Sequence, residues 1–523
     1  MIKFNRFGIP AAFILFLLLL SCFSSYSTDD AFISYRFAAN FADGYGLVFN
    51  RGSVPVEGYT NFLWIILLSV GAFFKLPIPE TASLLGVCFS FGILVLMVIW
   101  ANRQRKLSPG FNIAAPVLIL ASTPSLALWS HTGMETPMFT FFLVLGTLFM
   151  GLEERRGWLG ALSGLTFALA ALTRPEGLLI GGIIIGYSYL KSGEWKHKLF
   201  SFITRMIVFL LPIFFHALWR KTYYGHWLPN TFYAKTCSGL ELTGNGLLYL
   251  KGFLFQGGLA WIILIVLALF IRPKIEGLST ILLLAVVYSV YVVWVGGDWM
   301  PANRLFLPIM PFLVMGASVF IAKSSSISPR LSILLTILLC NHLLIHGIKA
   351  NARFMEHSLF EQKVFGSDPP VDVLKELGLH LKKIASPDQV VAVVPAGKVP
   401  FYSNLKSIDM RGLCDDHISH QPFPEALDHV LPGHFKRDDD YVLKQRPDFI
   451  VVTGAVRKEN AEPIRAVKSL SSPAILDEWT ILNHPDFIAE YEEVRVEMPM
   501  GEKDLLYYKL KQFSDSSTEK NNK

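Results

Sequence analysis

Long apolar stretches separated by short polar segments fill the first two thirds of the chain. A bilayer core of about 30 Å needs ~20 apolar residues per helix. The pattern therefore predicts eleven membrane-spanning helices within residues 1–350. They lie near residues 8–25, 81–101, 112–129, 136–152, 158–173, 177–190, 199–219, 259–271, 278–295, 305–322 and 330–348.

After residue 350 the apolar stretches become short and alternate with charged segments. Residues 371–385 have the pattern of a helix, and residues 390–394 and 449–452 have that of buried strands. Residues 491–497 and 505–510 alternate like paired strands. We therefore predict a C-terminal α/β domain over residues 351–512, followed by a disordered tail over residues 513–523.

Lysine and arginine indicate which side of the membrane each loop occupies. With the N-terminus inside, the basic segments 103–106, 155–156, 191–198 and 272–274 also fall inside. This holds only if the apolar segment 60–76 does not cross, so we predict an interfacial helix there, on the outer leaflet. The first loop, residues 26–80, and the C-terminal domain are then extracytoplasmic.

Composition agrees with a membrane protein and argues against several other classes. Of the 523 residues, 52% are hydrophobic and only 17% are charged, with a mean hydropathy of +0.44; a soluble domain carries about 25% charged residues. Residues 1–352 have a net charge of +12 and residues 353–523 one of −6. The positive charge thus lies in the membrane part, and nucleic acid is not expected as a partner. The chain also lacks a Walker A loop, a GxSxG motif and an HExxH motif.

Two adjacent carboxylates, Asp29 and Asp30, follow the first span. Acidic residues in the first turn stabilise a helix, but a single one would be enough for this. A pair of like charges near lipid headgroups suggests a general base, a metal ligand or both. Thr28 or Asp29 is expected to cap the helix that follows.

Charged residues at other helix ends form further candidate sites on the outer side. Glu57 lies in a turn before the interfacial helix, where it could orient a sugar hydroxyl. Arg174 and Glu176 lie between two apolar stretches, and charges at membrane depth are costly unless they are paired or functional. An interhelical ion pair that fixes packing is the alternative explanation for these two residues.

Positive charge is normally depleted outside, yet several basic residues fall there. Lysine and arginine are the usual partners of phosphate, so a bound phosphate would explain them. These basic residues are Arg220, Lys221, Lys235 and Arg304. The Tyr and Trp residues among them are also typical of an interfacial aromatic belt.

Several short motifs in this order resemble the GT-C superfamily of polyprenyl-phosphate-sugar-dependent glycosyltransferases, and in particular bacterial terminal arabinofuranosyltransferases. The motifs are residues 29–36 (DDAFISYR), 46–50 (GLVFN), 56–61 (VEGYTN), 173–177 (TRPEG), 229–235 (PNTFYAK) and 297–301 (GDWMP), with residues 396–403 and 408–410 in the C-terminal domain. The resemblance covers roughly residues 1–455.

The resemblance implies a GT-C-like membrane module with juxtamembrane helices in the outer first loop, located in the bacterial inner membrane. It implies a catalytic base at the start of the first juxtamembrane helix, which is Asp29 or Asp30, with Asp29 slightly favoured. Some members of the superfamily use a divalent cation, and the sequence leaves this open because no complete ligand set is visible.

The expected reaction moves a sugar from a polyprenyl-phosphate donor to an envelope glycan, lipid or protein acceptor, with inversion at the anomeric carbon. Arg304 is expected to bind the donor phosphate, with help from Arg174, Arg220, Lys221 or Lys235. Candidate sugar- or acceptor-binding residues are Glu57, Tyr59, Asn61, Glu176, Tyr233, Asp298 and Trp299. The sequence names neither the sugar nor the acceptor. A lipid or solute transporter and a non-catalytic scaffold are the competing interpretations; transporters often have repeated halves, which this chain lacks.

Overall fold

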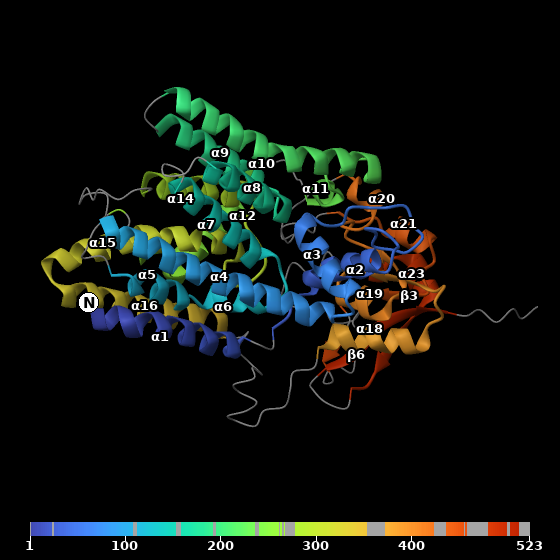
Figure 1. Cartoon of the computed structure of the whole chain (residues 1–523). Coiled ribbons are helices and arrows are strands. Elements are labelled where there is room, and N and C mark those ends of the chain that lie inside the picture. Colours follow the sequence, from blue (N-terminus) through green and yellow to red (C-terminus); the bar gives the residue numbers. More distant parts are fainter. Residues whose placement is uncertain are drawn as a thin grey trace, which may run out of the picture. The chain divides into compact units, whose positions relative to one another are not determined.

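The chain divides into two compact units that do not follow chain order (Figure 1). The computed structural model describes residues 2–23, 26–107, 112–152, 158–191, 195–235, 240–260, 262–263, 266, 278–352, 372–422, 436–453, 455–457, 480–498 and 503–511. The helical unit comprises residues 1–31, 60–228 and 237–369, and the sheet unit comprises residues 32–59, 229–236 and 370–523. Segments 32–59 and 229–236 are thus grouped with the C-terminal part of the chain, and the predicted domain bounds stay a prediction.

The helical unit consists of apolar helices that pack side by side. α8 packs against both α7 and α10, and α4 packs against α6 and α7. The elements are α1 (Ile2–Cys22), α3 (Phe62–Phe73), α4 (Ile78–Leu107), α5 (Ala114–Ala121), α6 (Pro124–His131), α7 (Thr136–Leu152), α8 (Trp158–Thr173), α9 (Glu176–Lys191), α10 (Trp195–Tyr224), α12 (Leu240–Phe253), the π-helix η2 (Leu254–Gly258), α14 (Leu278–Trp294), the 3₁₀-helix η3 (Arg304–Ile309), α15 (Met310–Ile327) and α16 (Pro329–Asn351).

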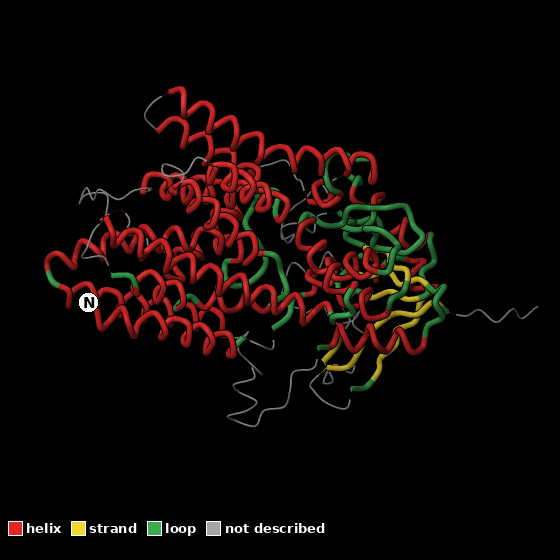
Figure 2. The backbone as a smooth tube through the Cα atoms, in the orientation of Figure 1, coloured by secondary structure: helices red, strands yellow, loops and turns green. Residues whose placement is uncertain are grey.

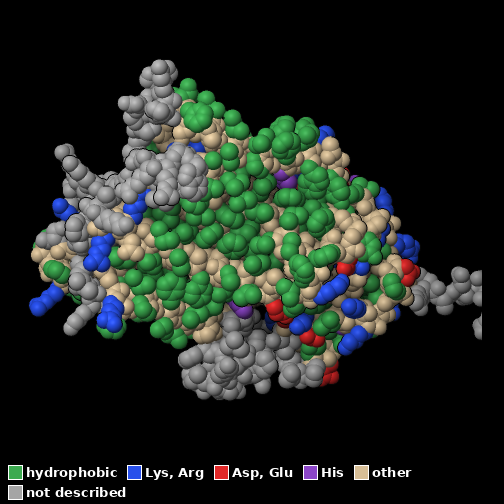
Figure 3. All heavy atoms as spheres, viewed as in Figure 1, with side chains coloured by type: hydrophobic (Ala, Val, Ile, Leu, Met, Phe, Trp, Pro, Cys, Tyr) green, Lys and Arg blue, Asp and Glu red, His purple; other side chains and the backbone are tan. Residues whose placement is uncertain are grey.

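Several of these helices could cross a membrane. Within the described residues, five are long and apolar enough, and the bent pair α6–α7 makes a sixth if it counts as one span. Figure 3 shows apolar side chains over most of the visible surface of these helices. The chain is therefore a multi-pass membrane protein. The predicted number of eleven spans stays a prediction, and the span near 259–271 lies mostly outside the described residues.

Helix α3 lies in segment 60–76, which the distribution of lysine and arginine predicts not to cross the membrane. It has 12 residues, which gives a length of about 18 Å, well short of the ~30 Å of a hydrocarbon core. Trp64, Ile65 and Leu68 are buried, whereas Val70 and Phe73 are exposed. The length of α3 agrees with the predicted interfacial helix.

The strands gather in the sheet unit (Figure 2), where they form a mixed six-stranded sheet. The strand order is β2-β1-β3-β6-β4, and β5 also pairs with β6. β1 pairs in parallel with β2 and β3, whereas β6 is antiparallel to β3, β4 and β5. The strands are β1 (Val390–Val393), β2 (Lys406–Asp409), β3 (Phe449–Val451), β4 (Ala455–Arg457), β5 (Tyr491–Val496) and β6 (Lys503–Leu510). The strands expected at 491–497 and 505–510 are β5 and β6, and they pair as predicted.

Short helices accompany this sheet. Helix α18 begins where the Asp372 carboxylate accepts a hydrogen bond from the Lys375 N–H, and it buries Leu377 and Leu381 on one face. The helices of the sheet unit are α18 (Val373–Ile384), α19 (Lys398–Ser403), α20 (Asp416–Ser419), α21 (Asp439–Lys444), η7 (Ile481–Asn483), α23 (Pro485–Glu490), α11 (Asn230–Lys235) and most of α2 (Asp29–Ala42).

Arg36 explains why the first loop belongs to the sheet unit. Its side chain is buried and donates hydrogen bonds to the carbonyl oxygens of Phe49, Pro400 and Leu405 and to the Asn50 side chain. The Asn50 amide group in turn pairs with the backbone of Ser407 in β2. One guanidinium therefore joins α2 to segments that lie more than 360 residues further along the chain.

Replacing Arg36 by alanine should destabilise the sheet unit, because several buried carbonyl oxygens lose their donors. Each such group costs roughly 1–3 kcal/mol, so we expect a loss of at least about 2 kcal/mol in Arg36→Ala. Arg51→Ala is the matched control from the same loop. Its ion pair with Asp43 is exposed, so it should cost about 1 kcal/mol or less. Thermal unfolding of the purified proteins in detergent measures both; equal shifts would contradict the anchoring role of Arg36.

Candidate active site

Buried charges of the helical unit meet at Arg174. Its Nη1 donates to Glu135 Oε1 at 2.7 Å, and its Nε donates to Glu176 Oε1. Asn61 Nδ2 donates to the second oxygen of Glu135 at 2.9 Å. The Arg174 side chain is only 13% exposed and both carboxylates are less exposed still. The predicted residues Arg174, Glu176 and Asn61 therefore lie together.

A tight turn between α8 and α9 brings Arg174 and Glu176 together. α8 ends at Thr173 and α9 begins at Glu176, with Pro175 between them. A Cβ atom on Gly177 would lie 2.6 Å from the backbone nitrogen of Ala171, so only glycine allows the chain to fold back this closely. The sequence 173–177 is thus the local cause of the ion pair.

Glu135 was not singled out by the sequence. It lies at the break between α6 and α7, whose axes differ by 119°. His131, four residues before Glu135, has its Nδ1 2.6 Å from Ser83 Oγ. The available signal for Glu135 was an acidic residue between two apolar stretches, because a charge at such depth needs a partner.

A second buried ion pair joins Arg304 Nε to Asp298 Oδ2 at 2.7 Å. The guanidinium also lies 5.7 Å from the centre of the Trp129 ring, within the range of a cation–π interaction. Both partners come from the loop between α14 and η3. Asp298, predicted to bind the sugar or acceptor, and Arg304, predicted to bind the phosphate, are therefore in contact.

Strained backbone orients Arg304. Ala302 and Asn303 both have positive φ angles, 56° and 50°, a left-handed conformation that is unfavourable for alanine. The Asn303 side chain is held by a 2.7 Å hydrogen bond to Gln256 in the π-helix η2, and the Leu305 N–H donates to the Tyr249 hydroxyl. Such strain persists only where neighbouring contacts enforce it.

The two ion pairs belong to one electrostatic group, here called the ion cluster: Arg174, Arg304, Glu135, Glu176 and Asp298. The charges that act on the Arg304 guanidinium include Asp298, Arg174, Glu135 and Asp30. Helix α2 begins at Asp29, so Asp29 and Asp30 both lie in its first turn. Asp30, in this turn, is thus among the charges that act on Arg304.

The remaining predicted residues are not members of the ion cluster as defined above. Arg220 and Lys221 lie near the end of α10, where Lys221 Nζ donates to the Gly225 carbonyl, and Trp299 is 43% exposed. Glu57, Tyr59, Tyr233 and Lys235 belong to the sheet unit. The roles expected for these residues stay predictions.

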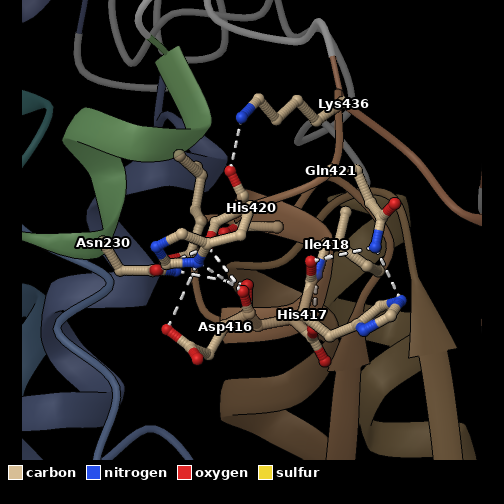
Figure 4. A network of polar contacts seen from close by, with 11 residues as sticks. Asn230, Asp416, His417, Ile418, His420, Gln421 and Lys436 are labelled. Atoms are coloured by element: carbon tan, nitrogen blue, oxygen red, sulfur yellow. Dashed lines mark hydrogen bonds and ion pairs between the residues drawn. The ribbon is translucent and has the colours of Figure 1, made fainter. Parts of the chain in front are cut away.

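Within the sheet unit, Asn230 organises the loop that follows β2 (Figure 4). Its Nδ2 donates to the carbonyl oxygens of Gly412 and Leu413, and its Oδ1 accepts from Ser419 Oγ at 2.6 Å. The Tyr233 ring lies 4.6 Å from the His420 ring. These contacts explain why segment 229–236 belongs to the sheet unit.

Asp409 supports the same loop from inside. Its two carboxylate oxygens accept from the N–H groups of Arg411 and Cys414. Burial raises the pKa of Asp409 to about 6, although these hydrogen bonds act in the opposite direction. The ring centres of Phe401 and Tyr402 lie within 6 Å of that of Phe32, which is buried. Both Asp409 and this aromatic group therefore hold the sheet unit together.

A metal site was left open by the sequence. Among the residues described for both units, no group of three His, Cys, Asp or Glu side chains is arranged to hold a metal ion.

One family model and one curated protein each match part of this chain. Residues 365–508 match a family described as a domain of unknown function (DUF8728). A terminal beta-(1->2)-arabinofuranosyltransferase of Corynebacterium glutamicum is 23% identical over 330 residues, which cover 55% of this chain and 47% of that protein. The chain thus spans about half the length of this curated relative.

Solved structures resemble the chain over almost its whole length. ArnT from Cupriavidus metallidurans bound to undecaprenyl phosphate matches 97% of this chain and 98% of its own, with a TM-score of 0.53 and 13% identity. Its apo state gives a TM-score of 0.54 at 12% identity, with the same coverage. At this identity the likeness shows only a shared fold. The resemblance to the GT-C superfamily is therefore confirmed for the fold.

Relief of the strain next to Arg304 should be measurable. Glycine adopts positive φ readily, so Ala302→Gly should leave stability unchanged within about 0.5 kcal/mol, since relief of strain offsets the greater flexibility of the unfolded chain. Ala161→Gly makes the same change inside α8 and should cost about 1 kcal/mol. Thermal unfolding in detergent compares the two; an equal loss in both would show that residue 302 carries no strain.

Proposed function

Because the chain has the GT-C fold, we propose that it is a membrane glycosyltransferase that moves a sugar from a polyprenyl-phosphate donor to an acceptor hydroxyl. The observation that carries the proposal is the ion cluster, where the Asp30 carboxylate acts on a buried arginine that can receive a phosphate. A proton acceptor close to an anion-binding group is the pair that this reaction needs.

Asp30 is the proposed general base, with Asp29 as the alternative in the same helical turn. The acceptor hydroxyl gives its proton to the carboxylate while its oxygen attacks the anomeric carbon. The bond from that carbon to the phosphate oxygen breaks, and the polyprenyl phosphate leaves with the electron pair. Attack opposite the leaving group inverts the anomeric carbon.

Arg304 is the proposed phosphate-binding residue. Asp298 occupies its Nε, and within the described residues no protein hydrogen bond to its Nη groups is present, so these can stabilise the charge that develops on the leaving phosphate. Arg174 is less suited to this role because Glu135 and Glu176 already hold its guanidinium. Arg220, Lys221 and Lys235 remain proposed secondary contacts for the phosphate.

The proposed reaction takes place on the outer face of the bacterial inner membrane. Lysine and arginine place the loops that carry Asp29, Asp30 and Arg304 outside, together with the sheet unit. In this arrangement, with eleven spans, the sheet unit is extracytoplasmic and meets an envelope glycan, lipid or protein as acceptor. The name of the Corynebacterium relative makes polyprenyl-phosphate arabinofuranose the first donor to test.

Removing the base should abolish transfer without unfolding the protein. Asp30→Asn keeps the size and polarity of the side chain but cannot take a proton, so transfer should fall by about 10²–10⁴-fold. Asp29→Asn is the matched neighbour and should lose far less. The measurement is release of labelled sugar from the lipid-linked donor in membranes containing equal amounts of each protein. Normal transfer by both variants would refute the assignment of the base.

Replacing the proposed phosphate-binding arginine should affect donor use more than protein amount. Arg304→Lys keeps the charge but loses the second N–H group that a phosphate oxygen would bind, so the KM for the donor should rise about tenfold. Arg330→Ala, an exposed arginine at the start of α16, is the control and should leave the KM unchanged. Initial rates at varied donor concentration measure the effect. If Arg304→Lys lowers only the amount of folded protein, Arg304 has a structural role.

A further inference from the structure

Three tyrosines lie beside the ion cluster, and none was singled out by the sequence. Tyr249 comes from α12, and Tyr288 and Tyr291 come from α14. Helix α14 packs against α9, which begins at Glu176, and against η3, which begins at Arg304. The Tyr288 side chain is fully buried, at 0% exposure, and its ring centre lies 5.9 Å from that of Tyr291.

The three hydroxyl groups differ in their partners. The Tyr249 hydroxyl accepts from the Leu305 N–H at 3.2 Å, and the Tyr291 hydroxyl makes a hydrogen bond with Glu176. The Tyr288 hydroxyl has no hydrogen-bond partner in the part of the chain that the structure describes. The charges that act on it most strongly are those of Glu176 and Arg174.

A buried hydroxyl without a partner is unfavourable, because it has lost water and gained nothing in exchange. Such a group therefore needs an explanation. A ligand that enters the cluster and supplies an oxygen atom would provide the missing partner. The position of Tyr288, beside the charges that the proposed reaction uses, favours this explanation over packing alone.

The charge of the cluster indicates which part of the donor Tyr288 would meet. Three carboxylates surround two guanidiniums, and both oxygens of Glu135 and the nearer oxygen of Glu176 are already bound. A phosphate next to Arg174 would lie against Glu135 and Glu176, which already hold that guanidinium, so the proposed phosphate position is at Arg304. Uncharged sugar hydroxyls are acceptable there, because they can both donate to a carboxylate and accept from a phenol.

We propose that Tyr288 is a sugar-recognition residue, whose hydroxyl donates a hydrogen bond to a hydroxyl oxygen of the sugar carried by the lipid-linked donor. The inference rests on the proposed function and adds the residue that distinguishes the sugar from the bare lipid phosphate. Tyr288 is covered in the structure, so the sugar reaches it when a neighbouring side chain moves aside. Tyr291, one turn further along α14, is only partly buried, and its ring is in contact distance of the Tyr288 ring.

The test compares Tyr288→Phe with the wild type and with Tyr249→Phe. Each purified protein is unfolded thermally alone, and its affinity is measured for polyprenyl-phosphate arabinofuranose and for undecaprenyl phosphate without a sugar. Tyr288→Phe removes a hydroxyl that has no protein partner, so the ligand-free melting temperature should stay the same or rise. Binding of the sugar-bearing lipid should weaken about three- to tenfold, the worth of one hydrogen bond, and binding of undecaprenyl phosphate should be unchanged.

Tyr249→Phe is the matched control, because it removes a hydroxyl that accepts a backbone hydrogen bond and should therefore lower the ligand-free melting temperature. A similar drop in Tyr288→Phe would identify a structural hydroxyl and overturn the proposal. If Tyr288→Phe bound both lipids equally more weakly, Tyr288 would contact the phosphate and the proposal would be wrong. If Tyr288→Phe bound both lipids as tightly as the wild type, the proposal would also be wrong. If the wild type binds neither lipid, the proposed function itself fails and the role of Tyr288 fails with it.

Discussion

The pairing of one buried arginine with two carboxylates is the constraint on which the helical unit depends. Arg174 lies at the end of α8, Glu176 begins α9, and Glu135 lies at the break between α6 and α7. A charge at membrane depth is costly unless it is paired, so these three helix ends have to meet. Asn61 adds the start of α3 to the same point by its hydrogen bond to Glu135. One guanidinium and its partner Glu135 thus hold three interruptions of helical structure in place: the α8–α9 turn, the α6–α7 break and the start of α3.

The irregular backbone of the helical unit is concentrated around this group. The left-handed pair Ala302–Asn303, the π-helix that carries Gln256 and the sharp bend between α6 and α7 all border it. Each breaks the regular hydrogen bonding that apolar surroundings favour, and each is a feature that proteins commonly retain at functional sites. Stable packing alone would not require these three irregular backbone features in one place. Their coincidence with buried charge is the structural argument for chemistry at this position.

What the sequence predicted depended on local patterns. The strands of the sheet unit and the short length of α3 follow from alternation and apolar run length. Arg174 was recognisable as a charge between two apolar stretches, and Arg304 as a positive charge on the outer side, where such charges are normally depleted. Glu135 was missed because its partner lies 39 residues away. Tyr288 was missed because, within an apolar helix, a tyrosine looks like any other packing residue until its hydroxyl is seen without a partner.

The least predictable feature is that the compact units interleave along the chain, and it matters for the proposed base. Helix α2 is continuous, yet Asp30 belongs to the helical unit and Arg36 to the sheet unit. Six residues of helix correspond to about 9 Å. Asp30, whose carboxylate acts on Arg304, therefore lies only about 9 Å along α2 from Arg36, whose guanidinium binds buried carbonyl groups. Local sequence cannot reveal this, because the anchoring carbonyls come from the far end of the chain. The two ends of this one helix are thus held by contacts with different parts of the chain, Arg304 at Asp30 and the carbonyl groups at Arg36.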